Sequence, residues 1–266
     1  MSTTLRYFIK LSYNGSNFNG WQTQPNGITV QEVLEKALGV LLLKGIGVTG
    51  CGRTDTGVHA SEFYAHFDIE EEAMIISCDQ LKYKLNLLLP VSIVIHEIFK
   101  VKPDVHARFS ALSRTYRYQI STIKDPFSNG LTWFNHHQLN LDAMNSAAAI
   151  LMEYHDFTCF SKTRTQVKTN ICTISKAFWE QEGSMLIFTI TADRFLRNMV
   201  RAIVGTMLEV GREKISLDDF RKVIEGKNRS NAGFSVPPQG LFLTEVVYPE
   251  TIRENPVTIR ENPEVF

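Results

Sequence analysis

Asp55 is the residue of this sequence whose neighbours most clearly suggest chemistry. It lies in the stretch Gly50–Ala60, which reads GCGRTDTGVHA and holds three glycines within its first eight positions. Glycines allow backbone conformations and close approaches that a side chain would block. Arg53 precedes the acid by two positions, and the threonine hydroxyls of Thr54 and Thr56 flank it on both sides. The pattern predicts a tight loop between two strands that presents a single carboxylate to a cleft.

Three other interpretations of this stretch use the same residues. Asp55 could simply cap its own polar turn. Asp55-Thr56-Gly57 also spells the catalytic triplet of acid proteases, but that chemistry needs two carboxylates that share a proton, and the sequence has no second Asp-Thr-Gly or Asp-Ser-Gly. Cys51 could act as a nucleophile with His59 as its base, although no neighbour clearly orients such a base. The protease and cysteine interpretations are therefore weak.

The composition describes a soluble globular protein. Of the 266 residues, 44% are hydrophobic and 21% are charged, which suits one large domain or two small ones. No apolar run is long enough to span a membrane, and the first residues lack the apolar core of a signal peptide. We therefore expect a cytoplasmic protein with no membrane association.

The cysteines and histidines predict no metal site. Cysteines occur at positions 51, 78, 159 and 172, without a C-x-x-C pair, so neither a zinc site nor a disulfide framework is indicated. A reduced cytoplasm fits this usage. His136 and His137 form the one histidine cluster, but adjacent residues on a strand point to opposite faces. We expect no metal and no cofactor.

The charges balance overall but are segregated along the chain. The chain carries 28 basic and 28 acidic residues, whereas a nucleic-acid-binding protein is usually basic. Three stretches nevertheless concentrate basic side chains: Arg108, Arg114 and Arg117; Lys162, Arg164 and Lys168; and Arg194, Arg197 and Arg201. A basic surface would have to be assembled from these separate stretches.

Hydrophobic periodicity predicts the same order of elements in each half of the chain. Strands are expected over 5–13, 46–51, 63–69, 91–101, 115–121, 173–180, 185–192 and 241–248. Helices are expected from Thr29, from Ser77 to Leu89, and over 141–154, 195–210 and 216–226. Two successive β-α-β-β-α-β orders predict an α+β protein of two ferredoxin-like units with mainly antiparallel sheets side by side and the active-site cleft between them. The units would span residues 1–105 and 106–249. A tail over 250–266, which repeats Thr-Ile-Arg-Glu-Asn-Pro, is expected to lie on the surface without a catalytic role.

Segments along nearly the whole chain resemble one enzyme family. They are Tyr13-Asn14-Gly15, Gly20-Trp21-Gln22, Gly52–Ala60, His106–Ala111, Arg114–Tyr118, Asp156–Phe160 and Phe195–Arg201 with Gly205. In these segments the sequence resembles tRNA pseudouridine synthases of the TruA family. Thr56 and Thr115 depart from the usual pattern, which favours alanine and a basic residue at these positions.

The resemblance implies an isomerase that converts uridine to pseudouridine at positions 38 to 40 of the tRNA anticodon stem-loop. It implies that Asp55 is the nucleophile, that Arg201 pairs with it, and that Tyr116 stacks on the target base and helps to remove the C5 proton. Attack at uracil C6, attack at ribose C1′ and a glycal route stay open. No cofactor is implied, because the reaction neither gains nor loses an atom.

The resemblance also implies how the substrate is bound. Arg53 would hold the flipped nucleotide, since a base must leave its stack to react. Weaker candidates for backbone phosphate contacts are Arg108, Arg114, Lys162, Arg164 and Arg197. A homodimer is implied, with tRNA lying across both subunits. The competing hypothesis is a catalytically silent RNA-binding module, which the isolated acid at Asp55 disfavours.

Overall fold

The computed structural model describes residues 3–162 and 169–254. In the first half of the chain the elements are β1 (Thr4–Tyr13), α1 (Val30–Leu42), β2 (Val48–Gly50), β3 (His59–Glu70), α2 (Cys78–Leu88) and β4 (Ile93–Val101). In the second half they are β5 (Ser113–Ser121), β6 (Trp133–Phe134), α3 (Leu141–Leu151), β7 (Ile174–Glu182), β8 (Met185–Ala192), α4 (Met199–Gly211), α5 (Leu217–Glu225) and β9 (Leu241–Val247). Within the described ranges, every helix is too short or too polar to cross a membrane.

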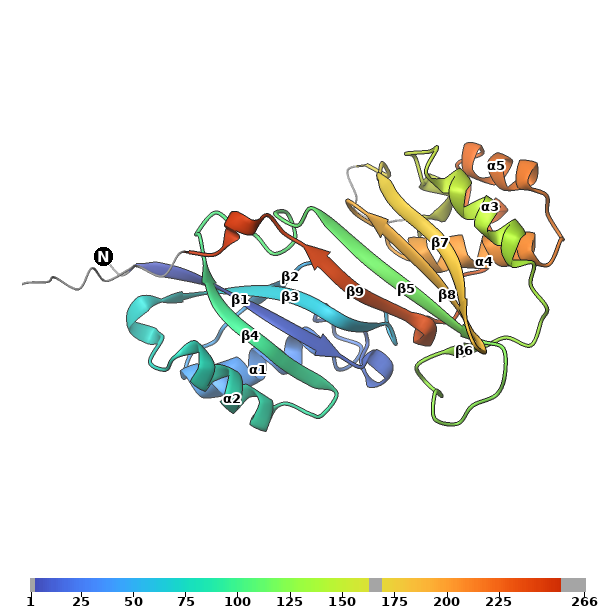
Figure 1. Cartoon of the computed structure of the whole chain (residues 1–266). Coiled ribbons are helices and arrows are strands. Elements are labelled where there is room, and N and C mark those ends of the chain that lie inside the picture. The colour runs from blue at the N-terminus through green and yellow to red at the C-terminus, as the bar shows by residue number, and fades with distance from the viewer. Residues whose placement is uncertain (1–2, 163–168, 255–266) are drawn as a thin grey trace, which may run out of the picture.

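The strands form one sheet that runs through both halves of the molecule (Figure 1). Its order is β4-β1-β3-β9-β5-β8-β7, with β2 paired to β3 and β6 paired to β5. Pairing within each half is antiparallel except for the short β6, which runs parallel to β5. The halves join where β9 runs parallel to β3 at His59–Phe242 and Ala60–Leu243. The expected mixture of helices and mainly antiparallel strands is confirmed. Where two sheets side by side were expected, the structure has one continuous sheet.

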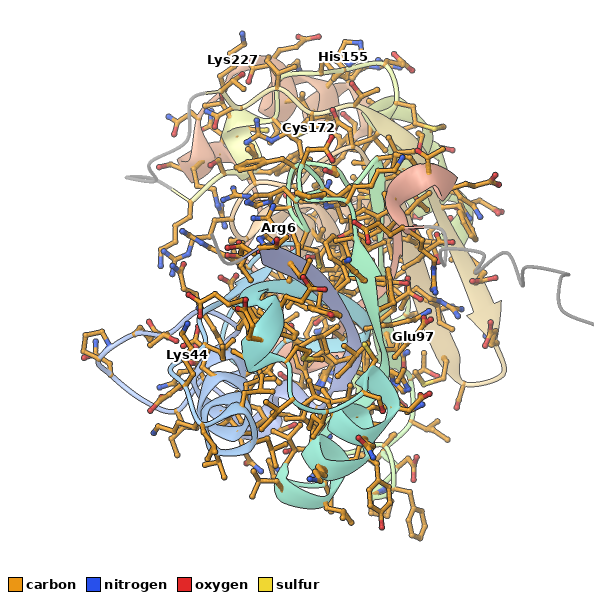
Figure 2. All side chains as sticks on the ribbon, turned by 90° about the vertical axis from the view of Figure 1, so that its left-hand side faces the viewer. Arg6, Lys44, Glu97, His155, Cys172 and Lys227 are labelled. Atoms are coloured by element: carbon orange, nitrogen blue, oxygen red, sulfur yellow. The ribbon has the colours of Figure 1, made fainter. Side chains whose placement is uncertain are left out.

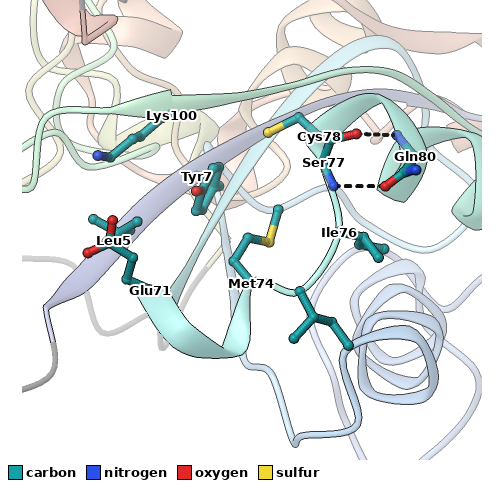
Figure 3. A pocket seen from close by; sticks show the side chains of 10 residues that line it. Leu5, Tyr7, Glu71, Met74, Ile76, Ser77, Cys78, Gln80 and Lys100 are labelled. Carbon is teal, nitrogen blue, oxygen red and sulfur yellow. Dashed lines mark hydrogen bonds between the residues drawn. The ribbon is translucent and has the colours of Figure 1, made fainter. Parts of the chain in front are cut away.

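The helices begin where side chains can satisfy their first amide groups. Thr29 accepts a hydrogen bond from the backbone N–H of Glu32 at the start of α1. Ser77 and Gln80 form a complete capping box at the start of α2, as the two dashed lines in Figure 3 show. Such bonds satisfy amide groups that have no partner within the helix. The two predicted helix starts are confirmed.

Two hydrophobic cores lie at opposite ends of the sheet. Helices α1 and α2 cover the first half and α3, α4 and α5 cover the second (Figure 1). In Figure 2, Lys227, which follows α5, lies at the top of the view, and Lys44, which follows α1, lies lower down. Strand β9 contributes to both cores, with Leu243 in the first and Leu241 in the second. The side chain of Tyr116, on β5, packs against both cores. The junction of the halves is therefore the place where residues from both can meet.

The structure differs from the predicted boundaries in one place that matters for the site. The predicted helix over 195–210 begins only at Met199, because Asn198 adopts a left-handed conformation with φ of 67°. A left-handed residue cannot continue a right-handed helix. Residues 195–198 therefore form a turn that leads into α4 and carries Arg197.

The tail begins against the edge of the sheet. Arg253 forms an ion pair of 2.7 Å with Glu97 and its backbone bridges to Val101 of β4. Most of the predicted repeat, over residues 255–266, lies outside the described residues.

A hollow of about 540 Å³ lies between β1, the end of β4 and the start of α2 (Figure 3). Leu5, Tyr7, Met74 and Lys100 line it, together with residues 75–78. Asp55 and the other predicted site residues are absent from its described lining, so this hollow is separate from the predicted site.

Candidate active site

Asp55 occupies the loop that joins β2 to β3. The backbone N–H of Val58 donates to the carbonyl of Asp55 across 3.1 Å and closes a turn. Gly57 within this turn has φ of +77°, a conformation that favours glycine. The Asp55 side chain keeps 26% of its surface exposed. The loop therefore supports the carboxylate from its backbone and leaves it accessible.

A segment near the N-terminus holds the backbone of this loop. The hydroxyls of Tyr13 and Thr54 lie 2.9 Å apart in a buried hydrogen bond, and the N–H of Trp21 donates to the Thr54 carbonyl across 3.2 Å. At Gly20 a Cβ atom would lie only 2.4 Å from the same carbonyl oxygen. Only a glycine lets the two backbones approach this closely. The sequence analysis assigned no role to these supporting contacts.

Two guanidinium groups from the other half of the chain face the carboxylate. Nη1 of Arg201 lies 3.7 Å from Oδ2 of Asp55, and Nε of Arg197 lies 3.6 Å from Oδ1. The Arg201 side chain is 18% exposed and that of Arg197 is 60% exposed. The partners of this carboxylate are thus two cations, whereas an acid protease pairs its catalytic carboxylate with a second carboxylate.

The structure brings together the predicted pair of Asp55 and Arg201. It also brings Arg197 to the carboxylate, where the sequence analysis had assigned Arg197 only to tRNA phosphates. A helix over 195–210 would have placed the two arginines on one side, four residues apart, but Arg197 lies in the turn before α4. The contact of Arg197 with Asp55 therefore had no reliable signal in the sequence.

Tyr116 lies on β5, where it is paired with Ile190 of β8 on one side and with Leu243 of β9 on the other. Its half-buried ring meets Phe195 edge to face, with centroids 5.1 Å apart. Burial raises the pKa of Tyr116 above its usual value, and the charges of Cys51 and Asp55 raise it further. The phenol is therefore protonated at neutral pH and can donate a hydrogen bond.

Cys51 and His59 both have structural surroundings. Burial raises the pKa of the Cys51 thiol to about 12, so the nucleophilic thiolate is scarce at neutral pH. Nδ1 of His59 accepts the backbone N–H of Gly15 across 3.0 Å, and its ring stacks on Phe242 at 4.5 Å. Burial also lowers the pKa of His59. These contacts disfavour the cysteine-nucleophile interpretation.

The remaining predicted cations differ in exposure. Arg53, Arg108 and Lys162 are exposed. Burial lowers the pKa of Arg108, and the nearby charges of Arg53, Arg194 and Arg114 lower it further, so four arginines share one region. The Lys162 backbone N–H donates to the Arg197 carbonyl across 3.1 Å. Arg164 lies outside the described residues.

Arg114 is buried, with only 9% of its surface exposed. Its Nη1 donates to the carbonyls of Ala111 and Asp193 at 3.0 and 2.8 Å, and its Nη2 donates to those of Cys51 and Arg108. Four of the five N–H donors of a guanidinium are thus directed at backbone carbonyls. This position indicates that Arg114 joins the loop of Asp55 to the chain around Arg108 and to the end of β8.

The described residues include no group of three or more His, Cys, Asp or Glu side chains that could hold a metal ion. The candidate site gathers one acid, two guanidinium groups and a protonated tyrosine. This set can supply a nucleophile, orient it and bind a polyanionic substrate around it.

Comparison with known proteins points to one family. A family described as tRNA pseudouridine synthase matches residues 147–249. A protein of Bacteroides fragilis named tRNA pseudouridine synthase A is 55% identical over 94% of this chain and 98% of its own length. Proteins of the same name from Porphyromonas gingivalis and Clostridium acetobutylicum are 50% and 40% identical, over 93% and 90% of this chain and 98% of each relative.

Proposed function

The chain belongs to the tRNA pseudouridine synthase A family, and we propose that it isomerises uridine to pseudouridine in tRNA with Asp55 as the nucleophile. The supporting observation is a contact between the two halves of the chain. Asp55, in the first half, lies 3.6 Å from a guanidinium nitrogen of Arg197 and 3.7 Å from one of Arg201, both in the second half. A surface that only binds RNA gains nothing from an acid among its cations, because RNA is itself a polyanion.

The reaction exchanges one bond for another. The bond from ribose C1′ to uracil N1 breaks, the uracil turns, and C1′ joins C5. The proton leaves C5 and N1 gains one, so the atoms balance without an oxidant or a reductant. Whether Asp55 attacks C1′ or C6, its negative charge is consumed in forming the bond. The charge is restored when that bond breaks, either as C5 displaces the carboxylate from C1′ or as the C6 adduct eliminates it. The two guanidinium groups attract the carboxylate and fix its direction beforehand.

Tyr116 and the exposed cations complete the proposal. Tyr116 stacks on the target base, which fits its place at the junction of the two cores. Arg53 holds the flipped nucleotide, and Arg108, Lys162, Arg164 and Arg197 bind backbone phosphates. We assign Arg114 to the support of the Asp55 loop, because carbonyl groups surround its guanidinium.

Asp55→Asn tests the assignment of the nucleophile. The amide keeps the shape of the side chain and removes its charge, so tritium release from tRNA labelled at uridine C5 should be abolished. tRNA affinity should change by less than about twofold, because binding depends on phosphate contacts elsewhere. Asp79→Asn, an exposed acid at the start of α2, is the matched control and should keep full activity. Turnover by pure Asp55→Asn protein would refute the assignment. Loss of activity in the control as well would show that the assay does not report on the site.

We further propose that the targets are uridines 38 to 40 of the anticodon stem-loop and that a cytoplasmic homodimer binds the tRNA. A dimer would let a chain with no net charge gather its basic stretches into one wide surface. Carbodiimide mapping of modified tRNA and sedimentation of the free protein test these two points. Modification only outside positions 38 to 40, or a monomer that retains full activity, would contradict them.

We also propose that residues 1–105 and 106–249 are two ferredoxin-like units. In the first half, the strands lie in the order β4-β1-β3-β2, and in the second half in the order β9-β5-β8-β7. With the two-residue β6 set aside, both orders place the fourth strand of the half beside the first, then the third and the second. The same antiparallel arrangement in both halves supports the proposal.

A further inference from the structure

The segment formed by residues 232–240 contacts Arg201 and the loop that carries Asp55. At one point, the backbone N–H of Val236 donates to the carbonyl of Arg201 across 3.2 Å, and Nε of Arg201 donates to the carbonyl of Val236 across 2.7 Å. At another point, Pro238 lies against Gly57 of the Asp55 loop, where a Cβ atom would be 3.0 Å from the proline ring. The position of the 232–240 segment therefore determines where the Arg201 guanidinium can lie.

The 232–240 segment is packed directly on the backbone of α4. A Cβ atom at Gly205 would lie 1.8 Å from the carbonyl oxygen of Phe234. The backbone N–H of Gly233 donates to the buried hydroxyl of Thr206 across 2.9 Å. Close packing against backbone leaves this end of the segment no room to approach the helix further.

Ser235 is the polar anchor in the middle of the segment. Its Oγ accepts a hydrogen bond of 2.6 Å from the side-chain amide of Asn198 and one of 2.8 Å from Nη2 of Arg229. Nη1 of Arg229 also donates to the carbonyl of Gly233 across 3.1 Å. Asn198 is the left-handed residue directly before α4. Ser235, which directly precedes Val236, is thus bonded to Asn198 in the turn that leads into α4, the helix of Arg201.

We infer that Ser235 is a positioning residue for catalysis, which acts by holding the Val236 carbonyl that orients Arg201 toward Asp55. The inference rests on the proposed role of Arg201. An arginine side chain has several rotatable bonds, and the hydrogen bond at Nε removes much of that freedom. With Nε held, Nη1 stays 3.7 Å from the Asp55 carboxylate. A displacement of about 1 Å at a reacting group can slow a reaction by about a hundredfold.

Ser235→Ala removes the acceptor that Asn198 and Arg229 share. We expect kcat for tRNA isomerisation, measured by tritium release, to fall about tenfold or more, while KM for tRNA changes less than about twofold. Asn198→Gly removes one of the same hydrogen bonds and suits the left-handed conformation, so it should lower kcat in the same direction. Ser146→Ala is the control. Among the described residues, the hydroxyl of this exposed serine on α3 donates to the Asp142 carbonyl in its own helix, and the variant should match the parent. If Ser235→Ala and Asn198→Gly both match the parent, the inference is overturned.

A double-mutant cycle tests whether Ser235 acts through Arg201. Because the effect should require the guanidinium, Ser235→Ala should not slow Arg201→Met any further. The same tenfold loss in both backgrounds would overturn the inference while leaving the proposed function intact. If Arg201→Met keeps the parent's rate, Arg201 has no catalytic role and both proposals about it fail. A slow Arg201→Met beside an unaffected Ser235→Ala overturns the positioning role alone.

Discussion

Arg114→Met separates two roles that the sequence and the structure suggest for the same side chain. As a phosphate ligand, Arg114 would contribute to tRNA affinity and little to stability. As the buried donor to four carbonyls described above, it would contribute to stability and little to affinity. Methionine fills much of the space of the arginine stem and removes every donor, so the variant tests the choice directly.

The structure sets the expected loss of stability. Hydrogen bonds from a charged donor contribute about 1.5 kcal/mol or more each, which gives about 6 kcal/mol for four. Part of this is offset, because the folded state no longer has to bury a guanidinium. We expect the free energy of unfolding to fall by about 4 kcal/mol. For a chain of this length, that lowers the melting temperature by about 8 °C.

Calorimetry and salt-dependent tRNA binding provide the assay. Each phosphate contact contributes about 0.7 to 0.9 to the slope of log affinity against log salt concentration. Arg114→Met should leave this slope unchanged and lower the melting temperature. The exposed Arg108→Met should do the opposite, with a slope smaller by about 0.8 and an unchanged melting temperature. A smaller slope at an unchanged melting temperature in Arg114→Met would refute the structural role of Arg114.

Three further results are expected. Arg201→Lys should lose about tenfold or more in single-turnover rate, because one ammonium nitrogen cannot keep both contacts of the guanidinium; the parent's rate in this variant would contradict the proposed pairing. Burial, then neighbouring arginine and histidine charges, lowers the pKa of His66 to about 4, so its share of stability is complete above about pH 6.5 and is lost as the pH falls toward 4. Urea unfolding should show that the free energy of unfolding falls between pH 7 and pH 4.5 by about 2 kcal/mol less in His66→Gln than in the parent. His155→Gln is the control: His155 is exposed and far from Arg6 in Figure 2, so this variant should behave as the parent does. Gly205→Ala should lower the free energy of unfolding by about 3 kcal/mol, because its Cβ would overlap a carbonyl oxygen at 1.8 Å, while Gly45→Ala, which meets nothing within 4 Å, should have little effect.

Local sequence patterns predicted the five helices, the strands other than the two-residue β6, two helix caps and the loop of Asp55. Each of these depends on residues close together in the chain, such as Ser77 and Gln80 in one capping box. The meeting of Asp55 with Arg201 was expected only from family resemblance. No periodicity within either half reports that two residues separated by almost 150 positions lie side by side.

The differences come from contacts between distant parts of the chain. Arg114 looks like a surface cation at the start of a strand, yet its carbonyl partners lie on the loops of Cys51 and Arg108 and at the end of β8. Asn198 shows the same limit, since its left-handed backbone interrupts an otherwise helical pattern and its side chain bonds to Ser235. Tertiary contacts overrode local preference at both positions.

Strand β9 occupies the middle of the sheet although it is the last strand of the chain. During synthesis on the ribosome, residues 1–240 emerge before the strand that joins β3 to β5. Until then, part of β3 and one edge of β5 have unpaired backbone groups, which invite association with other chains. The two halves also lack their shared strand, so fewer contacts, such as that of Arg114 with the Cys51 carbonyl, hold Asp55 near Arg201. The nascent chain therefore completes its sheet and the support of the proposed site in the same late step.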